Sequence, residues 1–300
     1  MQYRSFMIKQ NEGNNIYYFL KNKGFSENYI TNLRKTCDSI ILNGLKANTR
    51  TKIKEGDELK ISTSPNPKTT IKPCRIPLDI VFEDEYYLLI YKPSGLSCMP
   101  NRSHYDNNLA GGIIHYLSDK EPNFTLRIIN RLDKDTAGFI LIAKSSTALQ
   151  EIKEIDKSYL AICEGQILSN IVIDKKIETI NINGVNDKKR IISDNGKDAK
   201  TYVKPLSCNN NATLISVKLE HGRTHQIRLH LSSIGHPLVG DEIYGTQSNL
   251  INHTALICDK FTFFHPYKNQ KMVFTHPLPQ DFINALNKLG LKQPLQLSNL

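Results

Sequence analysis

The sequence predicts a two-domain protein of the α+β class, and three observations support this fold class. The chain has 300 residues, enough for one large or two ordinary domains with a substantial core. Apolar residues recur at helical spacing near the N-terminus, whereas later apolar runs have the length of buried strands. A stretch rich in Pro and Thr separates the two patterns. We therefore expect a small domain over 1–64, a linker over 65–76, a larger domain over 77–290 and a loose tail over 291–300.

Composition and charge narrow the class of partner. The net charge is +10, which favours polyanions through attraction to phosphates and release of counterions. Ribosome-associated scaffolding, catalysis on RNA and solubility alone would all produce this charge, so the activity stays open.

Several kinds of site and segment are not expected. The cysteines form no C-x-x-C pair, the histidines form no H-E-x-x-H cluster and no glycine-rich phosphate loop is present, so we expect neither a metal nor a cofactor. No apolar run approaches the roughly 18 residues of a membrane span, and MQYRSFMIKQ at the start resembles no secretory signal. These observations predict a cytoplasmic protein without a membrane partner.

The small domain should contain two helices followed by short strands. An apolar stripe at helical spacing ends just before Gly24, a residue type that commonly stops a helix. Ser26 then has the side chain of an N-cap for a second helix. Two short apolar segments, over 39–44 and 57–62, are predicted strands separated by a polar turn.

Basic residues are plentiful in this small domain and flank its apolar positions without interrupting them. A solvated charged face is the plain interpretation. However, the order helix–helix–strand followed by KANTRTKIKEGDELKI resembles the αL RNA-binding motif of small-subunit ribosomal protein four, including its turns at Asn43-Gly44 and Gly56-Asp57. The resemblance implies an RNA-binding module of small α/β type, and we take Arg34 and Lys35 as candidate RNA contacts.

In the larger domain, two of three informative stretches surround charged loops. Residues 79–100 contain a strand, an acidic turn, a second strand and the loop K-P-S-G. Residues 126–144 contain two Ile-rich runs of strand length with a charged connection between them. A solvated turn is the plain explanation of that connection. Its charged residues are Arg131, Asp133, Lys134 and Asp135.

The third stretch, residues 219–245, follows a predicted strand over 214–219 and should contain a helix. Thr224 can cap this helix, its buried stripe begins at Ile227, and Gly235 supplies a stop. Arg228 would then lie at the edge of the stripe, positioned to reach a carboxylate, although a structural ion pair is the plain alternative. The histidines here are expected to serve structure or RNA contact.

Together these stretches resemble the RluA-type RNA pseudouridine synthases over about residues 79–283. The resemblance implies a catalytic domain with a largely antiparallel, mixed sheet flanked by helices. It also implies an enzyme that detaches uracil from ribose, rotates it and rejoins it through carbon 5, without a cofactor. The matching segments are RLDKDTAG, GRTHQIRLHL with GHPLVGDEIYG, KSYLAICEG at 157–165, GKDAKTYVKPL at 196–206, and HPLP at 276–279.

The resemblance assigns roles to particular residues. Asp133 matches the family aspartate, which must be ionised and either attacks the sugar or ring or abstracts a sugar proton. Because burial raises the pKa of a carboxyl group, Asp133 needs a cation, and the planar fork of Arg228 is the matching partner. Arg131 matches a family arginine that helps open the duplex. Tyr159 matches the family tyrosine that stacks on uracil, and it is a candidate for removing the carbon 5 proton. Arg223 is a candidate phosphate contact, and core packing is the plain alternative for Tyr159.

Some positions depart from the family pattern. Asn130 stands where the signature begins with His, Ala137 replaces Ser, and Phe139 replaces Leu. Asn still forms hydrogen bonds and Ala is small, so these changes bear on the shape of the pocket and the choice of target. The aspartate and the arginine are both present.

The sequence therefore predicts a monomeric RNA pseudouridine synthase. Large-subunit ribosomal RNA is the expected substrate, because family members with this front domain commonly act there, and transfer RNA is the second candidate. A non-catalytic RNA-binding protein for ribosome assembly and a hydrolytic N-glycosidase are the rivals. Binding alone needs none of Asp133, Tyr159 and Arg228, and a glycosidase would release free uracil.

Overall fold

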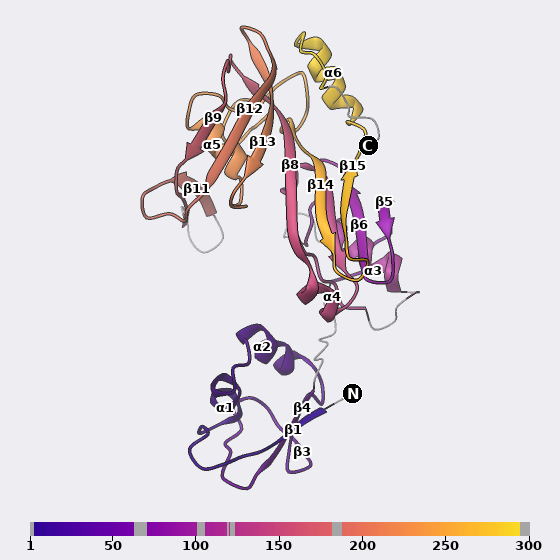
Figure 1. Ribbon diagram of the computed structural model, residues 1–300, viewed down its shortest axis with the longest axis vertical. Helices are drawn as coiled ribbons and strands as arrows, with labels where there is room; N and C mark the ends of the chain where they lie inside the picture. The colour runs from indigo at the N-terminus through magenta and orange to yellow at the C-terminus, as the bar shows by residue number, and fades with distance from the viewer. Residues whose placement is uncertain are drawn as a thin grey trace. The chain divides into compact units, whose positions relative to one another are not determined.

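The protein divides into two compact units in a computed structural model (Figure 1). One unit is Met1–Lys72 with Glu121–Leu126, and the other is Pro73–Lys120 with Arg127–Leu300. The structure describes residues 3–62, 71–100, 106–118, 120, 124–181 and 188–294. Of the predicted linker and tail, residues 65–70 and 295–300 lie outside the described residues.

The smaller unit contains a four-stranded antiparallel sheet, in the order β1-β4-β2-β3, and two helices. Both helices and two of the strands agree with the sequence pattern. The first strand, β1, was not predicted. The bounds are β1 Tyr3–Met7, α1 Ile16–Asn22, α2 Glu27–Lys35, β2 Ile40–Leu42, β3 Leu45–Lys46 and β4 Glu58–Ser62.

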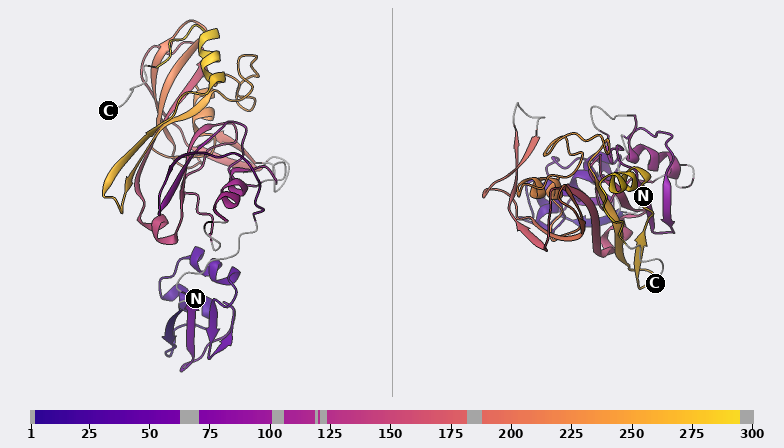
Figure 2. Two further views of the ribbon diagram at one scale, coloured as in Figure 1. Left: turned by 90° about the vertical axis from the view of Figure 1, so that its right-hand side faces the viewer. Right: turned by 90° about the horizontal axis from the view of Figure 1, so that it is seen from above.

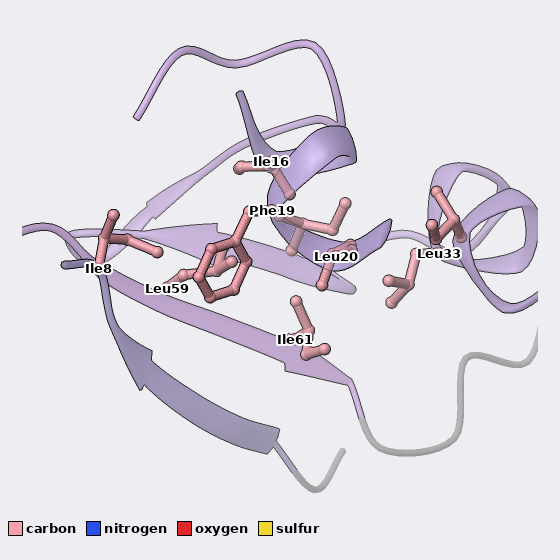
Figure 3. Packing of buried hydrophobic residues seen from close by; sticks show 9 residues of the cluster. Ile8, Ile16, Phe19, Leu20, Leu33, Leu59 and Ile61 are labelled. Carbon is pink, nitrogen blue, oxygen red and sulfur yellow. The ribbon is translucent and has the colours of Figure 1, made fainter. Parts of the chain in front are cut away.

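The core of this unit forms where α1 lies over the sheet. Ile16, Phe19 and Leu20 occupy one face of α1 and are fully buried, as helical spacing predicts. Figure 3 shows them directed toward Leu59 and Ile61 of β4, which belong to the same apolar cluster. Complete burial of a side chain of this size stabilises the fold by roughly 1.5–3 kcal/mol.

Local hydrogen bonds explain why the helices and turns occur where they do. The Ser26 hydroxyl accepts from the backbone N–H of Tyr29 at 3.2 Å, which confirms the predicted N-cap. Asn43 and Gly44 have φ of 52° and 81°, the left-handed pair of a tight hairpin turn. The Asn43 amide also donates to the Asp57 carboxylate at 2.8 Å. The two turn signatures seen in the sequence are therefore joined by one contact.

The larger unit is built on a nine-stranded sheet in the order β5-β6-β7-β14-β8-β13-β12-β9, with β15 paired to β14. Among the described strands of this sheet only β7 and β14 pair in parallel, so the predicted largely antiparallel, mixed sheet is confirmed. The bounds are β5 Asp79–Glu83, β6 Tyr87–Lys92, β7 Ala137–Ala143, β8 Lys153–Glu164, β9 Ile171–Asp174, β12 Lys200–Cys208, β13 Ala212–Leu219, β14 Leu256–His265 and β15 Gln270–Thr275.

The centre of this sheet is buried on both faces, since every residue of β6 and β7 is buried. Phe139 of β7 and Phe261 of β14 lie 6.2 Å apart between ring centroids in this core. Gly138 has φ +131°, and a Cβ there would lie 2.5 Å from the Cβ of Cys258. The parallel contact between β7 and β14 therefore requires glycine at this position.

The helices of the larger unit are few and short, and one hairpin stands apart from the main sheet (Figure 2). None of the described helices has the length and apolar content needed to cross a membrane. The helices are α3 Leu109–Ser118, α4 Ser146–Glu151, α5 Gln226–Ser232 and α6 Gln280–Lys288, and the hairpin consists of β10 Ile177–Asn181 and β11 Lys188–Ile192.

Two local predictions were wrong. The N-cap of α5 is His225 in a left-handed conformation, with φ 58°, in place of Thr224, because the backbone turns sharply before the helix. The apolar run over 126–129 is not a named strand. It pairs with β7 through one bridge between Ile128 and Ile142, after which side-chain bonds of Asn130 take the place of backbone pairing.

Candidate active site

The charged loop before β7 is attached to that strand by Asn130, one of the residues that depart from the family pattern. The Asn130 amide donates to the Phe139 carbonyl and accepts from the Leu141 N–H, both at 2.8 Å. The Asp133 carbonyl accepts from the Thr136 N–H at 3.2 Å and closes a turn. The Asn130 side chain thus makes two hydrogen bonds of the kind that a neighbouring strand would make. These bonds fix the point of the sheet at which the loop begins.

The K-P-S-G loop holds the same turn from a second direction. Lys92 is fully buried, and its ammonium donates to the carbonyls of Pro93, Leu96 and Lys134, each at 2.9 Å. Burial lowers the pKa of Lys92 to about 8. Further bonds run from the Gly95 N–H to the Lys134 carbonyl, from the Ser94 hydroxyl to the Asp135 carbonyl and from the Cys98 thiol to the Leu132 carbonyl. Backbone groups on both sides of Asp133 are therefore fixed.

A pocket of about 70 Å³ brings together five of the seven residues predicted for the site. The remaining two belong to the smaller unit: Arg34 donates from Nε to the Thr49 hydroxyl at 2.8 Å, and Lys35 is exposed. The five that line the pocket are Arg131, Asp133, Tyr159, Arg223 and Arg228.

Asp133 remains partly open to solvent, with 27% of its side chain exposed. The nearest ionisable partner is His225, whose Nε2 lies 4.0 Å from the Asp133 carboxylate. The other imidazole nitrogen, Nδ1, lies 3.0 Å from the Tyr244 hydroxyl. Burial lowers the pKa of His225, and the negative charge of Asp133 raises it by less. The net lowering favours a neutral imidazole beside the carboxylate.

The predicted ion pair between Arg228 and Asp133 was wrong. The guanidinium of Arg228 forms two hydrogen bonds to the Asp241 carboxylate. Nε donates to one oxygen at 2.7 Å, and Nη2 donates to the other at 2.6 Å. Asp241 is fully buried and also accepts the N–H groups of Ile243 and Tyr244. Asp241 lies in a turn between α5 and β14, and this turn brings its carboxylate, in place of that of Asp133, against the guanidinium.

The electrostatics of this buried pair favour charge on both members. Burial alone would lower the pKa of Arg228, but the hydrogen bonds and charge of Asp241 raise it. Burial alone would raise the pKa of Asp241, and Arg228 lowers it instead. The charge of Asp133 also raises the pKa of Arg228, so the arginine acts on that carboxylate through its field and not through a direct contact.

Tyr159 and Lys157 form another wall of the pocket from β8. Their side chains lie on the same face, two residues apart, and the Lys157 ammonium lies 5.9 Å from the centroid of the Tyr159 ring. Burial raises the pKa of Tyr159 well above its ordinary value and lowers the pKa of Lys157. The Lys157 ammonium has no hydrogen bond or ion pair among the residues that the structure describes.

Sequence reasoning missed Lys157 and Asp241, although both lie in the segments that carried the resemblance, K-S-Y and G-D-E. Neither spacing nor polarity showed which charged residue of those segments would point inward. Over the described part of the chain, no three His, Cys, Asp or Glu side chains come close enough together to hold a metal ion.

Comparison with known proteins gives consistent likenesses. The sequence profile of a family described as RNA pseudouridylate synthase matches residues 86–233. The uncharacterized RNA pseudouridine synthase YjbO of Bacillus subtilis is 31% identical over 270 residues, which cover 86% of this chain and 93% of that one. Ribosomal large subunit pseudouridine synthase D of Pseudomonas aeruginosa is 35% identical over 234 residues, covering 71% and 72% of the two chains.

A solved structure shares the fold over much of the chain. Human RNA pseudouridylate synthase domain containing 4 superposes with a TM-score of 0.58 and 22% identity, covering 72% of this chain and 94% of the human one. At this level of identity the likeness concerns the fold.

Proposed function

The chain belongs to the RNA pseudouridylate synthase family, and from this premise we propose that it isomerises specific uridines of large-subunit ribosomal RNA to pseudouridine. The enzyme class follows from the family: it is an RNA pseudouridine synthase, an isomerase that breaks an N-glycosidic bond and forms a carbon–carbon bond. The observation that carries the proposal is the pocket that gathers Arg131, Asp133, Tyr159, Arg223 and Arg228.

The choice of ribosomal RNA rests on relatives. Several carry the name ribosomal large subunit pseudouridine synthase D, at 29–35% identity. The net charge of +10 agrees with a polyanionic substrate but would serve transfer RNA equally well. Transfer RNA is therefore the second candidate, and we place the enzyme in the cytoplasm with its substrate.

Asp133 is the proposed catalytic carboxylate, because its partial exposure lets it meet a substrate while its backbone is immobile. The Lys92 ammonium and the Asn130 amide fix the turn from two sides. A fixed carboxylate avoids the loss of freedom that a mobile one would suffer in the transition state. The neighbouring His225 and the buried pair of Arg228 with Asp241 set its electrostatic surroundings.

Tyr159 is proposed to stack on the uracil that enters the pocket. Its raised pKa keeps the phenol protonated near neutral pH, which favours stacking and proton donation over service as a phenolate base. Arg131 is exposed at the pocket and is proposed to occupy or support the space that the flipped nucleotide leaves. Arg223 is proposed to bind a backbone phosphate.

The smaller unit is proposed to be an RNA-binding module, with Arg34 and Lys35 as contacts and a boundary near residues 64–76. Deleting residues 1–64 should weaken RNA binding and flatten its dependence on salt, because fewer phosphate contacts release fewer counterions. Filter-binding titrations at several salt concentrations measure both effects. An unchanged affinity and an unchanged slope would contradict this role.

The experiment that tests the main proposal compares the wild-type protein with Asp133→Asn on total RNA from cells lacking the gene. Carbodiimide-based mapping then locates pseudouridine. We expect new pseudouridine at one or a few uridines of large-subunit ribosomal RNA with the wild type only. Modification of a transfer RNA would move the second candidate ahead.

Two other results would overturn the proposal. If neither protein forms pseudouridine while both bind RNA equally, the assembly-factor hypothesis becomes the better one. If free uracil accumulates and abasic sites form, the chain is a glycosidase.

A further inference from the structure

A second hollow, of about 490 Å³, lies beside the catalytic pocket and shares Gly222 and Arg223 with it. This volume falls within the range of roughly 300–1,000 Å³ that is typical of small-molecule sites. A Cβ at Gly222 would meet no atom within 4 Å, so the space beside this shared residue is open. The polar residues that line the hollow include Thr179, Arg190, Asn195, Lys197, Arg223 and Thr224.

The hairpin β10–β11 forms one wall of the hollow. One face of the hairpin is apolar near the body of the unit and polar further out. Near the body of the unit, Ile177 and Ile192 are opposite each other and pack with Leu229 of α5. Two residues further out on that face, Thr179 is opposite Arg190. The apolar part therefore anchors the hairpin, and the polar part faces the hollow.

Positive charge predominates in the hollow. Its lining contains three cationic side chains, Arg190, Lys197 and Arg223, and one carboxylate, Glu178. Arg223 is positioned by a bond from its Nε to the Asp198 carbonyl at 3.0 Å. An arginine has five N–H donors, so the four on the Nη atoms of Arg223 remain for a phosphate.

Arg190 connects this hollow to the catalytic site electrostatically. Its charge lowers the pKa of His225, in addition to the larger effect of burial. His225 is in turn 4.0 Å from the Asp133 carboxylate. A phosphate bound by Arg190 would therefore lie close to the reacting nucleotide.

We propose that this hollow binds the nucleotide adjacent to the target uridine, with its base inside the hollow and the shared phosphate on Arg190 and Arg223. The inference rests on the proposed function and adds a subsite that reads sequence next to the target. Adjacent nucleotides share one phosphate, which fits two neighbouring hollows that share an arginine. Thr179, Asn195 and Thr224 supply hydrogen-bonding groups for the base.

The test is a binding experiment on the full-length protein in the Asp133→Asn background, so that its outcome is separate from catalysis. The probe is a short RNA around the uridine located by mapping, with one flanking phosphate at a time replaced by a neutral methylphosphonate. In the Asp133→Asn protein, replacing one of the two phosphates next to the target should weaken binding by about fivefold to tenfold. Adding Arg190→Gln should weaken binding of the unmodified RNA to a similar extent and reduce the sensitivity at that position to the part that Arg223 supplies.

The matched control is Lys189→Gln, which removes the same charge from the neighbouring residue of β11. Lys189 is exposed and, being one residue away, lies on the opposite face of the hairpin. This variant should retain the full methylphosphonate effect. Thermal unfolding of both variants verifies that the hairpin is intact, and Arg190→Lys, which keeps the charge, should restore part of the effect.

A second readout tests whether a base occupies the hollow. Removing the base of the adjacent nucleotide should lower kcat/KM of the wild type by about tenfold, whereas Thr179→Trp, which fills the hollow, should abolish the difference. Equal losses of RNA affinity in Arg190→Gln and Lys189→Gln would overturn the subsite. So would losses from the methylphosphonate and from Arg190→Gln that are additive, because additive losses indicate independent sites. Absence of any pseudouridine with the wild-type protein would instead count against the proposed function.

Discussion

Two buried cations, Lys92 and Arg228, support the surroundings of Asp133 in different ways. The Lys92 ammonium is satisfied by three backbone carbonyls, and burial lowers its pKa to about 8. The guanidinium of Arg228 is satisfied by the Asp241 carboxylate, and its pKa is raised. A charged partner therefore raises the pKa of a buried cation, whereas neutral carbonyls hold Lys92 in place without offsetting the lowering of its pKa by burial.

A third cation, Lys157, sharpens this comparison. It is partly buried, but its ammonium lies 5.9 Å from the centroid of the Tyr159 ring and has no hydrogen-bond acceptor among the described residues. Lys92 and Arg228 thus have internal partners, whereas Lys157 lines the pocket without one among the described residues. We infer that its partner is the RNA.

The largest expected effect on stability comes from breaking the buried ion pair. Arg228→Met leaves the Asp241 carboxylate buried without its cation and should lower the free energy of unfolding by about 3–5 kcal/mol. Asp241→Asn should cost less, because the amide still accepts one hydrogen bond. Urea unfolding at pH 7 measures both effects.

A double variant provides the control for this prediction. Arg228→Met combined with Asp241→Leu removes both charges and should recover a large part of the lost stability, because no charge stays buried unpaired. If the two single losses instead added in the double variant, packing and not the ion pair would explain them.

The next largest effect is expected at Lys92. Lys92→Met leaves three carbonyls without a donor and should lower the free energy of unfolding by about 1–3 kcal/mol, since removal of the buried charge offsets part of the loss. Because the Lys134 carbonyl adjoins Asp133, turnover should fall further than the population of folded protein does. Lys134→Met is the control, as only its backbone takes part, and its stability should stay within about 0.5 kcal/mol of wild type. Turnover that fell only in proportion to the folded population would contradict a positioning role.

The lowered pKa of Lys92 also predicts a dependence on pH. Between about pH 8 and 10.5, the ordinary value for lysine, the unfolded chain holds the proton and the folded protein does not. Stability then rises with pH relative to a variant without this group, because the cost of burying the charge is progressively relieved. The difference in the free energy of unfolding between wild type and Lys92→Met, measured from pH 7 to 10, should grow in favour of the wild type. Two parallel curves would show that Lys92 titrates at its ordinary pKa.

The smallest effect on stability is expected at Lys157. Lys157→Met should change the free energy of unfolding by no more than about 0.5 kcal/mol, because the charge has no internal partner to lose. It should nevertheless reduce kcat/KM by about tenfold if its partner is the RNA. Lys153→Met, an exposed position on the same strand, should change neither quantity. A loss of stability with unchanged kinetics would place Lys157 with the structural cations.

Local elements and the chemistry of the charged loop could be predicted from the order of the amino acids. The Ser26 cap, the helices of the smaller unit and the strands β5, β6 and β13 depend on neighbouring residues, so spacing and side-chain type predict them. Asp133 was identified in its loop because several matching segments occur in the right order. The mixed, largely antiparallel sheet came from the same resemblance.

Only the tertiary structure decided which charged groups meet. Asp133 and Asp241 were equally plausible partners for Arg228 in chemical terms, and the turn after α5 determined the choice. The Lys92 ammonium reaches a carbonyl 42 residues further along the chain, and the second hollow exists because a hairpin packs beside a distant loop. The physical reason is that ionic and hydrogen-bonding preferences do not depend on sequence separation, so only the path of the backbone selects among chemically equivalent partners.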